Sequence, residues 1–281
     1  MRRYFTFISV LVFLFINILN PCRAQDPVKV REILDQVEKQ EYNTETVDTL
    51  LEYSYLYWAR DLDSSLMFGE LAYQAAKKIG YIDGIADAHY KRSVAFRRKG
   101  ELINAVTEAK KCLVIADSIR DSTLLAKLNY QLGTIYKSMS NKKEALKHYN
   151  KALSTYLFMK DSKRLIAVYN GLGTYFQNVG AYQSALMNYQ NALFYAMELN
   201  DEKNQGIILG NLGSVYRELG LYEIAEEYFT TAYAISNKYE NIPEQSNILN
   251  RMGSMAYDQQ EYDKADSLYK LSYELKLQKN D

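Results

Sequence analysis

Two histidines, His89 and His148, and the adjacent carboxylates Glu226 and Glu227 are the residues of this 281-residue chain best suited to acid–base chemistry. A nucleophilic site needs a serine or cysteine within hydrogen-bond reach of its base. Nothing in the sequence places such a residue with either histidine, and paired carboxylates on a helix are typical of a solvated face. We therefore expect ordinary surface or partly buried roles for these residues, and no catalytic site.

Cofactor, metal and nucleic-acid sites lack their usual signatures as well. The glycines recur at 40-residue spacing instead of clustering after a strand, as a phosphate-binding loop requires. Two histidines and two cysteines are too few for a metal site without many carboxylates. Lys+Arg and Asp+Glu are balanced at 34 each, so no basic excess favours nucleic acid. We predict that the protein is not an enzyme, needs no cofactor or metal, and binds no nucleic acid.

The elements that must position any binding residue are long helices. The chain is 48% hydrophobic with only 3 prolines and 13 glycines, which excludes a disordered or collagen-like protein. Leu165, Val168 and Leu172 follow helical spacing, and Gly180 stands where a left-handed residue ends a helix. The same pattern restarts at Tyr182, so the sequence predicts two antiparallel helices joined by a short turn.

This two-helix motif recurs every 40 residues without a gap. It contains a Leu-Gly or Met-Gly pair at Leu132-Gly133, Leu172-Gly173, Leu212-Gly213 and Met252-Gly253. Alanine recurs at Ala105, Ala145, Ala185, Ala225 and Ala265. The small residues allow two helices to approach closely, and neighbouring aromatic residues fill the flanking space. Residues suited to capping the next helix stand at Asp121, Asp161, Asp201 and Asn241.

The motif resembles the tetratricopeptide repeat (TPR), in a 40-residue variant and an exported bacterial type. The third to fifth repeats match it nearly fully, the second lacks the glycine, and the sixth has Ala256 in place of the first aromatic residue. The common unit has about 34 residues, so longer helices are expected here. The resemblance implies an all-α fold, a right-handed α-solenoid of about six antiparallel helix pairs in a TPR superhelix.

The repeat register predicts the domain organisation. Residues 1–24 are a signal peptide, residues 25–44 hold a leading helix with Pro27 in its first turn, and residues 45–281 form six repeats. The predicted repeats span residues 45–81, 82–120, 121–160, 161–200, 201–240 and 241–281.

An uncharged apolar run at residues 4–19 follows the basic start of the chain. Its 16 residues are short for a bilayer span, which needs about 20, but suit a signal peptide cleaved after Ala24. We expect an exported protein, periplasmic or extracellular, whose mature chain does not insert into the membrane. An anchor formed by residues 4–19 and lipidation of Cys22 stay open. Cys112 is then the one remaining cysteine, and we expect it to be a buried small hydrophobic residue.

The resemblance also indicates the binding residues, because TPR proteins bind partners on the concave face lined by the first helix of each repeat. Asparagines on this face can both donate and accept hydrogen bonds, which suits the amides of an extended peptide, and cations there attract acidic groups. The exact pattern of the chaperone-binding carboxylate clamps, a matched Lys/Asn/Arg set, is not reproduced. The candidate groove residues are Lys91, Tyr130, Lys137, Asn170, Asn211, Arg217, Asn250 and Arg251.

Two functions are compatible with these observations. The first is a non-catalytic scaffold that binds a peptide or protein segment in the concave groove. The second is a sensor or ligand-binding ectodomain resembling those of bacterial membrane-bound two-component or transcriptional regulators, here without the output domain. The leucines Leu268, Leu271, Leu275 and Leu277 on the last predicted helix leave self-association through an uncapped final repeat as a further option.

Overall fold

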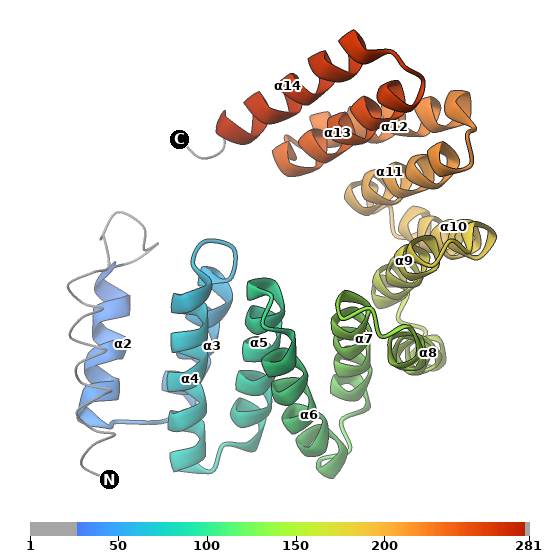
Figure 1. Ribbon diagram of the computed structural model, residues 1–281. Coiled ribbons are helices and arrows are strands. Elements are labelled where there is room, and N and C mark those ends of the chain that lie inside the picture. The colour runs from blue at the N-terminus through green and yellow to red at the C-terminus, as the bar shows by residue number, and fades with distance from the viewer. Residues whose placement is uncertain (1–26, 279–281) are drawn as a thin grey trace. The chain divides into compact units, whose positions relative to one another are not determined.

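The computed structural model describes residues 27–278, and this range contains thirteen helices and no strand. Helix α2 (Pro27–Lys39) comes first and is followed by six helix pairs (Figure 1). We call the first member of each pair its A helix and the second its B helix. Paired by their order along the chain, the helices are α3 (Thr44–Tyr57) with α4 (Leu62–Ile79), α5 (Ile82–Lys99) with α6 (Leu102–Ser118), α7 (Ser122–Ser138) with α8 (Lys142–Met159), α9 (Ser162–Asn178) with α10 (Tyr182–Glu198), α11 (Glu202–Glu218) with α12 (Tyr222–Lys238), and α13 (Ile242–Asp258) with α14 (Tyr262–Gln278). The predicted all-α repeat fold is confirmed.

The chain divides into two compact units between Met139 and Ser140. The first unit holds α2 to α7, and the second holds α8 to α14. Within each unit, neighbouring A helices contact one another: α3 with α5, α5 with α7, α9 with α11, and α11 with α13. Each unit therefore presents a layer of adjacent A helices. The residue boundaries of the six repeats stay a prediction.

The signal peptide, the anchor at residues 4–19 and the lipidation of Cys22 all lie outside the described residues. Among the helices of residues 27–278, none combines the length and the apolar character that a bilayer crossing requires.

The turns between helices share one backbone geometry. From residue 80 to residue 260, every twentieth residue has a positive φ angle. Gly100, Gly180 and Gly220 have φ angles of 83°, 77° and 75°, which confirms the predicted left-handed helix ends. Lys160 and Asn200 adopt the same conformation, at 53° and 50°, although they carry a β-carbon. The residue with the positive φ angle therefore occupies the same position in both kinds of turn, the one from an A helix to its B helix and the one from a B helix to the next A helix.

The recurring acidic and amide residues cap the A helices as predicted. In each case the backbone N–H three residues further on donates to the side-chain oxygen of the cap. The N···O distances are 2.9 Å from Leu124 to Asp121, 3.0 Å from Arg164 to Asp161, 3.1 Å from Asn204 to Asp201 and 3.4 Å from Glu244 to Asn241.

The glycines of the Leu-Gly pairs lie at close contacts between A and B helices. A β-carbon added at Gly173 would lie 2.5 Å from the ring of Tyr189, and one added at Gly213 would lie 2.8 Å from the ring of Phe229. Both rings are fully buried. The missing side chain thus makes room for an aromatic ring from the paired helix, as the sequence pattern predicted.

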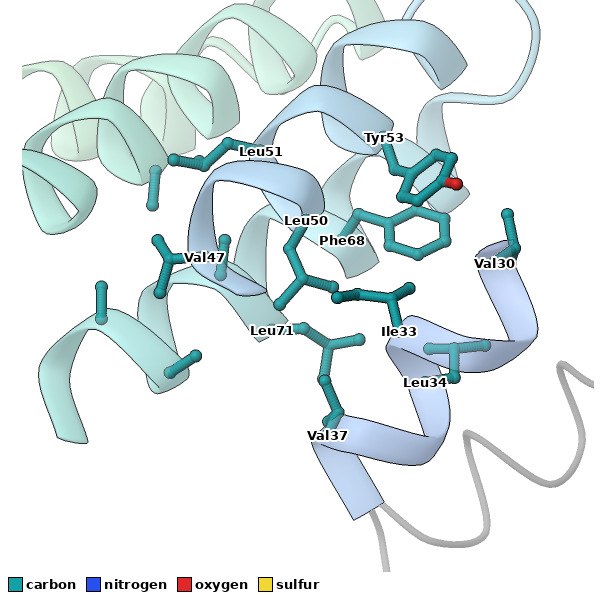
Figure 2. Packing of buried hydrophobic residues seen from close by; sticks show 14 of the residues in the cluster. Val30, Ile33, Leu34, Val37, Val47, Leu50, Leu51, Tyr53, Phe68 and Leu71 are labelled. Atoms are coloured by element: carbon teal, nitrogen blue, oxygen red, sulfur yellow. The ribbon is translucent and has the colours of Figure 1, made fainter. Parts of the chain in front are cut away.

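Helix α2 closes the core at the start of the first unit. Its residues Val30, Ile33, Leu34 and Val37 are buried against side chains of α3 and α4 (Figure 2). Leu50 of α3, Phe68 and Leu71 belong to the same cluster. Helix α2 therefore covers an apolar face that the first helix pair would otherwise expose.

Candidate functional site

The A helices of the second unit surround a polar hollow of about 330 Å³. Its walls come from α9, α11 and α13, together with Tyr189 of α10. Hydroxyl and amide groups dominate the lining, and Arg217, Arg251 and Glu218 are its charged residues. Four predicted groove residues line it, namely Asn211, Arg217, Asn250 and Arg251.

The asparagines are partly engaged with one another. Nδ2 of Asn211 donates to Oδ1 of Asn170 over 2.8 Å, which joins α11 to α9. Asn170 therefore offers its N–H groups, whereas Asn211 keeps an acceptor oxygen and one N–H. The structure thus pairs two of the three predicted amides and fixes their orientation before any ligand arrives.

The two arginines are only partly satisfied by protein groups. Nε of Arg217 lies 3.7 Å from Oδ2 of Asp258, beyond hydrogen-bond length. Nη1 of Arg251 is buried and has no hydrogen-bond partner among the described residues. Burial lowers the pKa of the Arg251 guanidinium from its ordinary value, and the carboxylate of Glu244 opposes this shift. Such guanidinium groups are suited to carboxylates, which they can bind through two parallel hydrogen bonds.

Tyr189 supplies a hydroxyl that the sequence reasoning missed as a site group. It donates to Oε1 of Gln177 over 2.9 Å and lies 3.2 Å from Oγ1 of Thr174. Gln177 in turn donates to Oε1 of Glu218 over 2.8 Å. Burial raises the pKa of Tyr189 to about 12, so the hydroxyl keeps its proton at neutral pH. The sequence contained a signal for this hydroxyl. Tyr189 stands at a recurring aromatic position beside the A helix, and the next repeat has Phe229, which lacks a hydroxyl, at the same position.

Three predicted site residues, Lys91, Tyr130 and Lys137, belong to the first unit and do not line this hollow. Nζ of Lys91 lies 3.5 Å from Oδ2 of Asp87 and 5.4 Å from the ring centre of Tyr55. Burial raises the pKa of Tyr130. Burial and the charge of Arg97 both lower the pKa of Lys137. These side chains are half-buried, and their part in binding stays a prediction.

His89 differs from the expectation of a surface or partly buried histidine. It is 5% exposed, and its Nδ1 lies 2.8 Å from Oε2 of Glu108. Nη1 of Arg92 lies 3.2 Å from the same oxygen. The reason is that Arg92 occupies the leucine position of the Leu-Gly pair in this repeat, so the core here is charged. His148 is 9% exposed, also more buried than expected.

Cys112 is fully buried, as predicted. Its Sγ donates to the backbone oxygen of Ala86 over 3.0 Å, and burial raises its pKa to about 12. The thiol therefore stays protonated and inaccessible, which fits a packing role.

Comparisons with solved structures support the fold. RapI in its apo form is similar with a TM-score of 0.70 at 14% identity, covering 97% of both chains. BtubC (BKLC) from P. vanneervenii has a TM-score of 0.64 at 17% identity, over 78% of this chain and 92% of that chain. NprR, in complex with its cognate peptide NprX, has a TM-score of 0.63 at 16% identity, over 94% and 76%.

Sequence comparisons give the family. No curated protein matches the chain significantly. Two family profiles, both described as tetratricopeptide repeat, match residues 126–163 and 164–238. Together with the paired helices, these matches identify the chain as a tetratricopeptide repeat protein.

Proposed function

We propose that this protein is a non-catalytic interaction scaffold that binds an extended peptide or protein segment along its A helices. The observation that carries the proposal is the polar hollow, which three consecutive A helices, α9, α11 and α13, build together. A peptide segment that follows these three neighbouring helices in turn runs extended across them.

The lining suits the chemistry of a peptide backbone. The amide of Asn250 can donate and accept hydrogen bonds, whereas the hydroxyls of Ser214 and Ser254 donate to the backbone oxygens of Gly210 and Asn250 and can accept from a ligand. Arg217 and Arg251 line the hollow together with one acid, Glu218, while Asp258 lies 3.7 Å from Arg217 and Glu244 lies near Arg251. Neither arginine is held by a hydrogen-bonded carboxylate, so both guanidinium groups are suited to a segment that carries an acidic group.

The fold likeness agrees with such a role. NprR is in complex with its cognate peptide NprX, so a chain with this helical architecture accommodates a peptide.

The test begins with capture of ligands by the full chain from an array of immobilised random hexapeptides. Captured peptides are then titrated against variants by fluorescence polarisation. Asn250→Ala removes hydrogen bonds to the ligand and should weaken binding about 5- to 150-fold. The matched control is Asn191→Ala, because Asn191 is exposed on the B helix α10. Equal loss in both variants, with folding intact by circular dichroism, would rule out the hollow as the binding surface.

We also propose that the chain is exported in the 40-residue TPR form suggested by its sequence, with residues 1–24 removed. The apolar run at residues 4–19 is the support for cleavage. Mass spectrometry of the secreted or periplasmic protein should find Gln25, or its cyclised form, at the N-terminus. A full-length chain in the membrane, or a lipid on Cys22, would contradict the proposal. Self-association through α14 stays a prediction.

A further inference from the structure

Among three equivalent positions on the A helices of the second unit, one has no side chain. The residue two places before the Leu-Gly or Met-Gly pair is Asn170 on α9, Gly210 on α11 and Asn250 on α13. Gly210 is buried, and a β-carbon added there would lie 3.0 Å from Nη1 of Arg251. The guanidinium of Arg251, from the next A helix, therefore occupies the space that a side chain at position 210 would need.

A carboxylate partly balances this guanidinium without binding it. Oε1 of Glu244 would lie 3.7 Å from the same added β-carbon, so it too lies above Gly210. No hydrogen bond or ion pair joins Glu244 to Arg251 within the described residues, and Oε1 of Glu244 and Nη1 of Arg251 are both buried without a partner. The charge of Glu244 thus attracts the guanidinium of Arg251, but Glu244 accepts no hydrogen bond from Nη1 of Arg251.

A buried, charged donor without an acceptor is unfavourable, so its position must be imposed by the surrounding structure. Nη1 itself is shielded from solvent above Gly210, whereas Arg251 as a residue lines the hollow. An anionic group in the hollow can therefore accept from the remaining N–H groups of the same guanidinium and balance its charge. The space above Gly210, which holds the guanidinium of Arg251, keeps this group within reach of a ligand in the hollow.

We propose that Gly210 is a positioning residue that seats Arg251 at the wall of the hollow, where it binds a carboxylate of the ligand peptide and so determines the preference for an acidic ligand. This inference rests on the proposed peptide-binding function. The carboxylate is either an Asp or Glu side chain or the C-terminus of the peptide.

The experiment measures preference as well as affinity. Three fluorescein-labelled hexapeptide pools serve as probes, each randomised over Ala, Gly, Ser, Gln, Leu and Tyr. The first has both ends blocked, the second is blocked and contains one fixed Glu, and the third has a free C-terminal carboxylate. The full wild-type chain should bind the second or third pool about tenfold more tightly than the first. Whichever acidic pool binds more tightly identifies the source of the carboxylate.

Gly210→Ala should reduce this tenfold preference towards one, because the new β-carbon displaces the guanidinium. Its melting temperature should equal or exceed that of the wild type, since alanine favours a helix and the crowded atom ends a flexible side chain. Gly206→Ala, one turn earlier on α11, faces Ile235 and not Arg251, so it should keep the preference whatever its stability. In the double variant Gly210→Ala with Arg251→Lys, the slimmer ammonium should restore part of the preference.

Other results would overturn the inference in distinguishable ways. Wild-type protein that binds none of the pools would overturn the peptide-binding function and this inference together. Wild-type protein that binds all three pools equally would leave the scaffold function intact and overturn the role of Arg251. A Gly210→Ala variant that loses affinity for all pools alike, or melts several degrees lower, would show that Gly210 serves packing alone.

Discussion

The second and fifth helix pairs have the same architecture but different cores. In α11 and α12, Leu212 and Gly213 form the signature pair, and Gly213 contacts the ring of Phe229. In α5 and α6, 120 residues earlier, the equivalent pair is Arg92 and Ser93. The residue equivalent to Phe229 is then an alanine, Ala109.

In each of these two pairs, the size of the residue on the B helix compensates for the size of the residue on the A helix. Where the A helix has glycine, the B helix supplies a ring; where it has Ser93, the B helix has only a methyl group. Ser93 is buried and its hydroxyl donates to the backbone oxygen of Ala105 over 2.8 Å. The first pair departs from this exchange, because Arg92 of α5 fills the space beside Gly69 of α4: a β-carbon added at Gly69 would lie 2.8 Å from Cγ of Arg92. In the second and fifth pairs, the volume between the helices is therefore preserved more strictly than the residue types that fill it.

The charged residues of the second pair also compensate for one another. Glu108 accepts from His89 and from Lys111, both over 2.8 Å, and lies 3.2 Å from Nη1 of Arg92. Arg92 also pairs with Glu70 over 2.9 Å. The fifth pair has instead the stacked rings of Tyr216 and Tyr228, whose centres lie 5.3 Å apart. A buried ion network thus stands where its counterpart has aromatic packing.

The largest expected effect is removal of the acid at the centre of this network. Glu108→Ala leaves Arg92 and His89 facing each other in the core, so urea unfolding should show a loss of about 3–5 kcal/mol. Glu227→Ala, on the exposed face of α12, should change stability by less than about 0.5 kcal/mol. Similar losses in the two variants would mean that the network is no more important than surface charge.

Acid should weaken the second pair more than the fifth. Burial alone would raise the pKa of Glu108, but hydrogen bonds from His89 and Lys111 and the charge of Arg92 lower it from 4.5 to about 2. A lowered folded-state pKa gives stabilisation that is complete above pH 4.5 and is lost as the pH falls towards 2. The loss should be about 3 kcal/mol.

Hydrogen exchange between pH 5 and pH 2 can compare the amides of α5 and α6 with those of α11 and α12. The Glu108→Gln variant should flatten the pH dependence of α5 and α6 and leave that of α11 and α12 unchanged. A wild-type profile in which both pairs lose protection in parallel would contradict the assignment to Glu108.

A smaller effect on stability is expected from a substitution in the fifth pair, because close packing and not buried charge determines which residues fit between its helices. Gly213→Leu forces atoms against Phe229 and the backbone oxygen of Ala225, which would lie 3.2 Å from the new β-carbon, so it should cost about 1–3 kcal/mol. The volume exchange can be tested by combining Gly213→Ser with Phe229→Ala, the arrangement of the second pair. The double variant should be more stable than Phe229→Ala alone. Any rise in melting temperature for Gly213→Leu would contradict the close contact.

The sequence predicted the features that depend on neighbouring residues in the chain. Helix spacing, the caps at Asp121 and Asp201, and the left-handed turn at Gly180 all involve residues within a few positions of one another. The Asn211–Asn170 bond, the position of Tyr189 and the seat of Arg251 on Gly210 depend on how separate helices are offset. A 40-residue alignment states which residues are equivalent but not which of them touch, so these contacts required the structure.

The left-handed residue at every twentieth position has a consequence for how such a chain can change in length. Each helix with its turn is an exchangeable segment, because both kinds of junction place this residue alike. A gain or loss of 40 residues between two such positions keeps the alternation of A and B helices and preserves the layer of A helices within a unit. A gain or loss of 20 would join the helices equally well, yet would put a B helix into the A layer and present outward-facing residues to the ligand. The turn geometry therefore permits either step, whereas the contacts between A-helix glycines and B-helix rings, together with the surface of the A layer, restrict duplications and deletions to whole pairs.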